Sequence, residues 1–277
     1  MKKITALFLV LVLAASLFTA CGKKEEVADS SSEPETTASL FDGENPQYIN
    51  QFFDPWTSIQ PKNDPDRYSD TILNFSREGI PDGAIVFYGS SGFTRWSTKY
   101  GNTPVEEAIL TESGEQICVN RGFGGSNVHD LCMQYYAVLQ NYNFKAIVIT
   151  TFMNASGYTV LEQMQLLAWL LTQIRNDHPD AHIYITDFRP TAKDMSASAI
   201  KTRYEYNDRL AKYCANFDNI TIIELSKAPM FYNDPADAGT YKNINKDIFV
   251  EDQVHYTKEG YDMVTEVFKE ALAEELK

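Results

Sequence analysis

Cysteine is scarce in this sequence, with four residues among 277. Beyond Cys21 they are Cys118, Cys132 and Cys214, and their spacing fits neither a zinc site nor the disulfide framework of a small secreted protein. Cys118 falls in a strand pattern and the other two on apolar helical faces, which predicts buried free thiols. One disulfide among these three is the alternative outside the cytoplasm.

Positive charge is also in short supply. The chain has 24 lysine and arginine residues against 38 aspartate and glutamate residues, for a formal net charge of −14. An acidic surface repels nucleic acid and anionic lipid headgroups, so neither is expected as a partner.

Long apolar runs are missing apart from residues 4–18 near the N-terminus, a stretch too short for a comfortable membrane span. Lys2 and Lys3 precede this run and small residues follow it, which is typical of a secretion signal over residues 1–20. Cys21 directly after Ala20 resembles the lipidated cysteine of a bacterial lipobox. We therefore expect lipid anchoring at Cys21 on the outer face of the cytoplasmic membrane; ordinary secretion with an incidental cysteine is the alternative.

Residues 21–45 have no apolar periodicity and are rich in lysine, glutamate, serine and threonine. Such a composition predicts a flexible tether. The remaining residues, 46–277, contain neither an internal repeat nor a sign of a second domain, and they suffice for one domain with a full core.

Within this domain, five short apolar runs read as strands buried on both faces. They are residues 84–88, 116–119, 146–151, 182–186 and 220–225. Helical patterns around residues 128–139, 160–174, 200–214 and 261–272 separate or follow them. Alternating strands and helices predict an α/β fold: a doubly wound, flavodoxin-like, five-stranded parallel sheet with helices on both faces.

The residues suited to chemistry follow these strands. Ser91, Gly125 and Asn154 come after the first, second and third strands, while Asp252 and His255 come after the last. In parallel sheets, ligands bind beyond the carboxyl ends of the strands, so these residues should share one edge. A serine needs a base to take its proton, and a histidine base needs a carboxylate to fix its tautomer. The sequence thus contains a candidate triad in the order Ser, Asp, His.

Two alternatives stay open at this stage. Ser90, rather than Ser91, is the other candidate nucleophile in Gly89-Ser-Ser91. Asn154 is also suitable as a cap for the helix that begins near Thr159.

Three blocks of the sequence resemble the conserved blocks of the SGNH (GDSL-type) hydrolases. They are Ile85-Val-Phe-Tyr-Gly-Ser-Ser-Gly-Phe-Thr-Arg-Trp96, Asn120-Arg-Gly-Phe-Gly-Gly-Ser126 and Asp252-Gln-Val-His-Tyr-Thr-Lys-Glu-Gly-Tyr261. The resemblance implies that Ser91 is the nucleophile, His255 the general base and Asp252 its orienting carboxylate. It also implies an oxyanion hole formed by the Ser91 and Gly125 amides and the Asn154 side chain.

The third block departs from the family pattern Gly-x-Asn-Asp. Phe152 and Ala155 stand where glycine and aspartate are usual, while Asn154 is kept. A bulky Phe152 would be able to reshape the pocket or tilt Asn154, which puts the third oxyanion donor in question.

Other polar residues carry weaker signals. Arg95 and Arg121 suit either a substrate carboxylate or a structural ion pair. His178 and His182 are separated by Pro179 in a turn, so they predict no metal site. His129, at the start of a helix, is expected to be a surface or capping residue.

The sequence therefore predicts a lipid-anchored extracytoplasmic serine esterase or acylhydrolase that acts on an acylated glycan, a lipid or a small ester. It implies no metal and no organic cofactor. An acyltransferase acting on cell-surface sugars is one alternative, and a non-catalytic surface lipoprotein with a degenerate site is another.

Overall fold

The computed structural model describes residues 59–277, except 153, 155, 156 and 194. The predicted signal, the lipidation site Cys21 and the tether over residues 21–45 therefore lie outside the described part of the chain. No helix among the described residues is long and apolar enough to cross a membrane.

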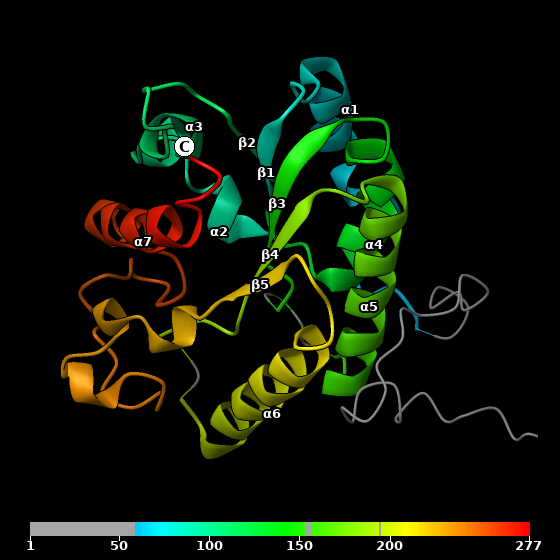
Figure 1. Cartoon of the computed structure of the whole chain (residues 1–277). Helices are drawn as coiled ribbons and strands as arrows, with labels where there is room; N and C mark the ends of the chain where they lie inside the picture. The colour runs from blue at the N-terminus through cyan, green and yellow to red at the C-terminus, as the bar shows by residue number, and fades with distance from the viewer. Residues whose placement is uncertain (1–58, 153, 155–156, 194) are drawn as a thin grey trace, which may run out of the picture. The chain divides into compact units, whose positions relative to one another are not determined.

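A five-stranded sheet lies at the centre of the domain, and all its strand pairs are parallel (Figure 1). Its strands are β1 (Ala84–Gly89), β2 (Cys118–Gly122), β3 (Phe144–Ile149), β4 (His182–Thr186) and β5 (Ile220–Ile223), in the spatial order β2-β1-β3-β4-β5. This order and the five strands confirm the predicted doubly wound fold. The predicted β2 began two residues early and ended three residues early, and the predicted β3 began and ended two residues late.

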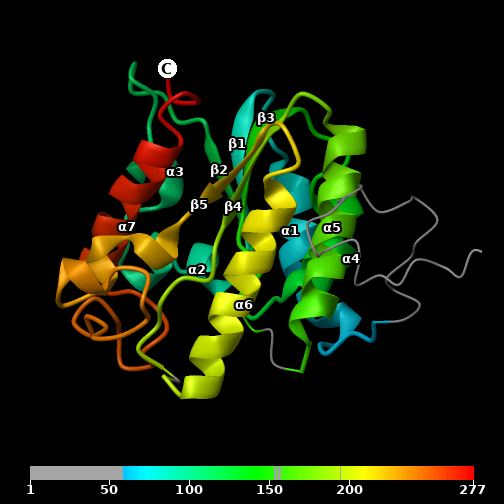
Figure 2. The same cartoon turned by 60° about the horizontal axis from the view of Figure 1, so that its bottom comes forward.

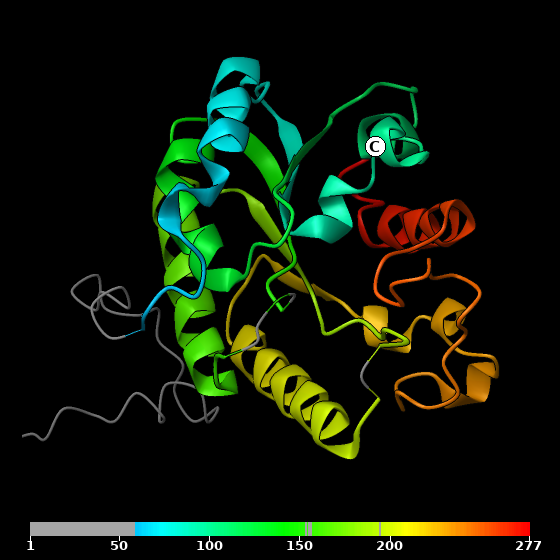
Figure 3. The ribbon, with the colours of Figure 1, turned by 180° about the vertical axis from the view of Figure 1, so that it is seen from behind.

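Helices cover both faces of the sheet, as Figures 1 and 3 show from opposite sides. One face carries α1 (Ser69–Glu78), α4 (Val128–Val138), α5 (Val160–Asp177) and α6 (Ala197–Cys214). The other carries α2 (Ser91–Thr94), α3 (Val105–Ala108) and α7 (Lys258–Ala271). Single turns of 3-10 helix complete the chain: η3 (Pro65–Tyr68), η4 (Thr98–Tyr100), η5 (Leu225–Lys227), η6 (Pro229–Phe231) and η7 (Pro235–Asp237).

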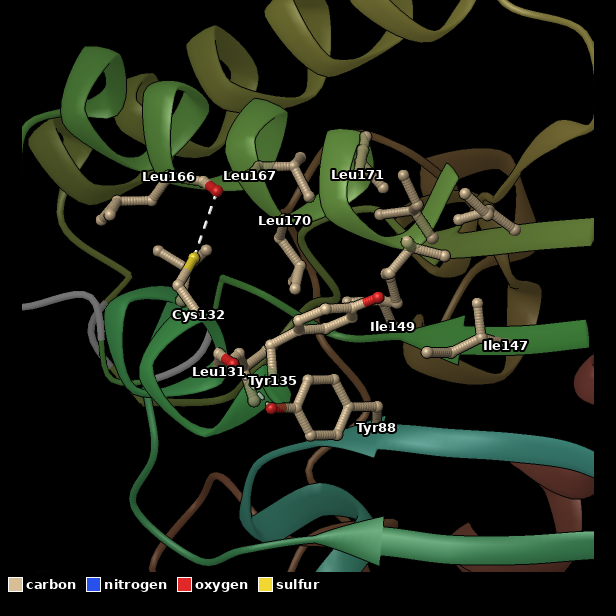
Figure 4. Close-up of a cluster of buried hydrophobic side chains, with 14 of the residues drawn as sticks. Tyr88, Leu131, Cys132, Tyr135, Ile147, Ile149, Leu166, Leu167, Leu170 and Leu171 are labelled. Atoms are coloured by element: carbon tan, nitrogen blue, oxygen red, sulfur yellow. Dashed lines mark hydrogen bonds between the residues drawn. The ribbon is translucent and has the colours of Figure 1, made fainter. Parts of the chain in front are cut away.

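Side chains of β1 alternate between the two faces of the sheet and contribute to the hydrophobic core on each face. Val86 and Tyr88 point into the layer under α4 and α5, whereas Ile85 and Phe87 pack on the α7 side. In Figure 4, Tyr88 and Tyr135 lie among leucines of α5 and isoleucines of β3, and the Tyr88 hydroxyl donates to the Leu131 carbonyl at 2.6 Å. Every residue of β1 is buried, which fixes the strand that ends at the candidate nucleophile.

The three described cysteines are buried free thiols, on β2, α4 and α6 as the sequence predicted. Cys132 donates to the Leu166 carbonyl of α5 at 3.2 Å, a contact drawn in Figure 4.

Helix starts near the functional edge are capped by side chains. Asn127 and Thr159 form capping boxes with Asp130 and Glu162 at the starts of α4 and α5, and Thr257 caps α7. Because Thr159 caps α5, the alternative that Asn154 caps this helix is wrong. The turned view in Figure 2 shows η5, η6 and η7 beside the start of α7.

Candidate active site

Ser91 lies two residues beyond the end of β1, at the first position of the short helix α2. Two contacts hold α2 in place: the Asn120 side chain donates to the Phe93 carbonyl at 2.8 Å, and the Tyr261 hydroxyl donates to the Gly92 carbonyl at 2.8 Å. The side chain of Ser91 is partly exposed, whereas Ser90 is 1% exposed. The strand-to-helix turn thus presents one of the two serines and buries the other.

His255 and Asp252 lie in the turn before α7, 164 residues from Ser91 along the chain. The Nε2 atom of His255 is 2.7 Å from the Ser91 Oγ, and its Nδ1 atom is 2.6 Å from the Asp252 Oδ2. The backbone N–H groups of Val254 and His255 donate to the Asp252 Oδ1, each at 2.9 Å. The carboxylate is therefore fixed by its own turn, and it fixes the imidazole with Nδ1 as donor and Nε2 facing the serine.

Burial lowers the pKa of His255 below its ordinary value, and the nearby Arg95 and Arg189 guanidinium groups lower it further. The hydrogen bond and negative charge of Asp252 act in the opposite direction. Burial alone would raise the pKa of Asp252, but hydrogen bonds from His255 and Val254 hold it at about 2. At neutral pH the pair is therefore a neutral imidazole beside an ionised carboxylate, which is the form needed in a general base.

Arg95 forms an ion pair with the carboxylate of this pair. Its Nη1 atom is 3.4 Å from the Asp252 Oδ2, with both side chains about one third exposed, and its guanidinium lies over the Tyr100 ring at 5.3 Å. The sequence was compatible with two roles for Arg95, binding of a substrate carboxylate and a structural ion pair. In the structure it contacts the carboxylate that orients the histidine.

Two backbone amides of this region, on Ser91 and on the loop after β2, have no partner in the part of the chain that the structure describes. Neither the Ser91 nor the Gly125 N–H has a hydrogen-bond partner among the described residues. The loop that carries Gly125 is tied to the end of β1, because the Phe123 N–H (2.9 Å) and the Ser126 hydroxyl (3.2 Å) both donate to the Gly89 carbonyl. Gly125 has φ of +85°, a left-handed conformation that favours glycine.

Asn154 joins the two segments that carry these amides. Its Nδ2 atom donates to the Ser90 Oγ at 2.8 Å and to the Ser126 carbonyl at 3.0 Å. Both amide hydrogens thus have partners, so an added contact to an oxyanion would require one of them to be shared. Asn154 itself has φ of +57°. Phe152 is buried against the Phe188 and Tyr206 rings, at 3.8 and 4.0 Å between ring centroids. Its ring therefore packs into the core instead of filling the site.

Arg67 is a residue at this site that sequence reasoning missed. A Cβ atom on Gly125 would come within 2.6 Å of the Arg67 Nη2, so the guanidinium lies against that glycine. Asn63 accepts from the Arg67 Nη1 at 2.9 Å, and the Tyr68 ring lies 5.4 Å from its Cζ. Arg67 has no carboxylate within ion-pair distance among the described residues. No motif marks this position, because η3 reaches the glycine loop only through the tertiary fold.

Several other polar residues of the sequence do not join the site. Arg121 is buried and pairs with Glu78 at 3.2 Å, which is a structural role. His178 packs on Phe144, and His182 contacts Thr221 and Glu275. Within the described part of the chain, no group of three or more His, Cys, Asp or Glu side chains is placed to hold a metal ion.

His129 corrects an expectation. It is buried, with Nε2 3.0 Å from the Ile59 carbonyl and its ring stacked near Tyr158, and Asn127 caps the helix. The expectation of a surface or capping residue was therefore wrong, because residues before α1 cover the start of α4.

Comparisons with known proteins give a fold but no close relative. The sequence matches no protein-family model and no curated protein. Solved structures match over most of their length. They include a GDSL-like lipase from Bacteroides thetaiotaomicron, with 17% sequence identity, TM-score 0.60 and coverage of 76% of this chain and 99% of that one. An acetyl xylan esterase matches with 14% identity, TM-score 0.54 and coverage of 68% and 99%. A psychrotrophic esterase from Pseudoalteromonas, inhibited by monoethylphosphonate, matches with 12% identity, TM-score 0.50 and coverage of 70% and 98%. The chain therefore has the fold of the GDSL-like lipases and esterases.

Proposed function

We propose that this protein is a serine esterase or acylhydrolase of the SGNH type. The observation that carries the proposal is the continuous chain of contacts from the Ser91 Oγ through His255 to Asp252. The GDSL-like fold supports it independently, because several solved proteins with that fold are named as lipases or esterases.

In this mechanism His255 Nε2 takes the proton of Ser91 as the Oγ attacks the carbonyl carbon of the ester. Asp252 stabilises the imidazolium that forms, and the carbonyl oxygen becomes an oxyanion within reach of the Ser91 and Gly125 N–H groups. The tetrahedral intermediate then collapses, the alcohol leaves with the proton from His255, and an acyl group remains on Ser91. Water, deprotonated by His255, attacks this acyl group and releases the acid.

Asn154 supports the oxyanion amides in this scheme. Since it connects Ser90 to Ser126, it fixes the separation between the segments that end in the Ser91 and Gly125 amides. Preorganised donors of this kind typically contribute about 10²–10³ in rate each.

We place the enzyme, again as a proposal, on the outer face of a bacterial cytoplasmic membrane, anchored by lipid at Cys21. The support is the apolar run of residues 4–18, the small residues before Cys21 and the polar segment after it. Acylated glycans and lipids are both present at such a location.

The first test is labelling with a fluorophosphonate, which reacts with base-activated serines. We expect wild-type protein and Ser90→Ala to be labelled and Ser91→Ala and His255→Ala to remain unlabelled. Unlabelled wild-type protein that is folded by circular dichroism would support the non-catalytic alternative. Product analysis with water alone and with added sugar acceptors would separate hydrolysis from acyl transfer.

A further inference from the structure

A large pocket lies on the β4 and β5 side of the candidate triad. Its volume is about 630 Å³, within the range of small-molecule sites. Ala192 and Met195, which follow β4, line one side of the pocket, and residues between Asn233 and Asp247, among them Lys242 and Lys246, line the other. None of these residues has a place in the mechanism above.

The pocket is close to His255. The Ala192 and Lys193 N–H groups donate to the Gln253 carbonyl at 3.0 and 3.1 Å, and Arg189 donates to the Val254 carbonyl at 2.8 Å. The wall of the pocket is thus hydrogen-bonded along the turn that carries the catalytic pair. Hydrogen-bonded chains lie about 5 Å apart and two residues span at most about 7 Å, so Ala192 is within about 12 Å of His255. An ester at Ser91 whose alcohol part is a disaccharide or a longer saccharide can extend over that distance.

Whereas the whole chain is acidic, the pocket is lined by more positive than negative side chains. Its two ammonium groups, on Lys242 and Lys246, have no ion-pair or hydrogen-bond partner among the described residues, although Asp247 also lines the pocket. By contrast, Lys212, Lys258 and Lys269 each pair with a carboxylate one helical turn away. On a chain of net charge −14, unpaired lysines in a pocket form a local site for an anion.

The remaining lining suits a polyol. Asn233 and Asn243 are exposed carboxamides joined by a 3.1 Å hydrogen bond, which leaves further donor and acceptor positions free for hydroxyl groups. Met195, Ile200 and Ile244 supply an apolar surface for the C–H face of a ring. Lys242 is held between two left-handed residues, Tyr241 at φ of +55° and Asn243 at +50°. Tyr241 is buried and bonded to Asn207, so this strained turn is fixed in place.

We propose that this pocket binds the alcohol part of the ester as a sugar or polyol that carries a carboxylate or a phosphate. This proposal rests on the proposed esterase function and adds the class of substrate. Lys242 and Lys246 bind the anionic group, and the two asparagines bind hydroxyl groups.

Binding is tested by calorimetry on the Ser91→Ala protein, which removes the proposed nucleophile and leaves the pocket intact. The probes are an acetylated oligosaccharide that contains uronic acid, the same oligosaccharide after reduction of its carboxylates to alcohols, and a hexose phosphate. We expect the uronate probe to bind at least about tenfold more tightly than its reduced form. Binding of the hexose phosphate alone would assign the anion as a phosphate. Equal binding of charged and reduced probes, or no binding of any probe, would overturn the proposal.

Residue assignment is tested with Lys242→Gln and Lys246→Gln in the same background, with Lys269→Gln on α7 as the matched control. Each pocket variant should weaken binding of the anionic probe about tenfold, and the control should bind as the parent does. In active protein, the pocket variants should raise KM for the acidic ester and leave hydrolysis of nitrophenyl acetate unchanged. Because calorimetry requires no turnover, loss of esterase activity with retained lysine-dependent binding would refute the proposed function alone.

Discussion

At the scale of single residues, the two adjacent serines have opposite surroundings. Ser91 Oγ contacts His255, whereas Ser90 Oγ is buried and accepts from Asn154. We expect Ser91→Ala to abolish hydrolysis of nitrophenyl acetate, because only the Ser91 hydroxyl has a base. Ser90→Ala should stay active at a reduced rate, because it keeps the nucleophile and loses only the contact with Asn154. Initial rates of the two purified variants decide this. Turnover by Ser91→Ala close to that of wild type would contradict the assignment.

The positive charge of Arg95 should affect the pH dependence of kcat/KM. It lowers the pKa of His255, so the base form of the histidine persists to lower pH than it otherwise would. We expect kcat/KM to rise with pH through one deprotonation below the ordinary histidine range, and Arg95→Met to move this limb to higher pH. The sign follows because removal of a cation makes it easier to protonate the imidazole. Profiles of the two proteins between pH 4 and 9 test the expectation; Lys99→Met, a neighbouring cation, is the control.

Asn154 gives the sharpest test of the third block. Loss of the Asn154 side-chain amide should misplace the Ser91 and Gly125 N–H groups. Because these groups bind the oxyanion in the transition state, kcat should fall by about two orders of magnitude with little change in KM. Alanine at φ of +57° would also strain the backbone by about 1–2 kcal/mol, whereas glycine would not. Asn154→Gly therefore isolates the amide. Unchanged kcat in that variant would contradict the role of Asn154 in holding the Ser91 and Gly125 amides in place.

The sequence predicted the residues of the candidate site only where they belong to a short local motif. Ser91, Asp252 and His255 stand in local blocks, and each is fixed by its own turn. Arg67 and Lys242 have no such blocks, because their positions depend on segments that meet only after folding. The partner of Asn154 was also beyond prediction, since Ser90 and Ser126 come from two other loops.

At the scale of elements, buried Asp187 connects the end of β4 to η5. Its carboxylate accepts from the backbone N–H of Ser226 at 2.8 Å and from the Ser226 hydroxyl. Burial raises the pKa of Asp187 to about 6, although these hydrogen bonds oppose the shift.

The folded state therefore binds this proton more tightly than the unfolded chain, whose aspartates titrate near pH 3.9. The contribution of Asp187 to stability is fully present below about pH 4 and decreases as the pH rises through 6, by on the order of 2 kcal/mol. We expect the unfolding free energy of wild type relative to Asp187→Asn to fall by that amount between pH 4 and 7. Urea titrations at both pH values measure it, and an equal difference at the two would contradict it.

Element positions were predicted well because their signals are local. The strands are near-continuous apolar runs, and the starts of α4, α5 and α7 have side-chain caps. Helices α1, α2 and α3 and the five described 3-10 turns were not predicted. The wall around Lys242 was not predicted either, since residues 226–250 have no periodicity. Their arrangement depends on contacts such as Tyr241 to the Phe188 carbonyl at 2.5 Å.

At the scale of the whole molecule, the proposed lipid anchor predicts the compartment of the enzyme. We expect Cys21→Ser to move the protein from the membrane fraction to the soluble or secreted fraction, or to leave it as an unprocessed precursor. Detergent partitioning and the mass of the mature protein measure this. An unchanged mass and partitioning would mean that Cys21 is incidental and that the protein is secreted in the ordinary way.

The hydrogen bond between the Ser91 Oγ and the His255 Nε2 joins chain positions 164 residues apart, and this separation has a consequence for biosynthesis. The base and its carboxylate are made after all five strands, so a nascent chain can complete its sheet while it still lacks them. Non-local contacts of this span also form late in folding, because the closure of a long loop is entropically costly. On the proposed mechanism, the chain is thus inert during synthesis, and esterase activity requires the turn that carries Asp252 and His255 to dock beside Ser91. During refolding, esterase activity should return later than the helical circular dichroism signal.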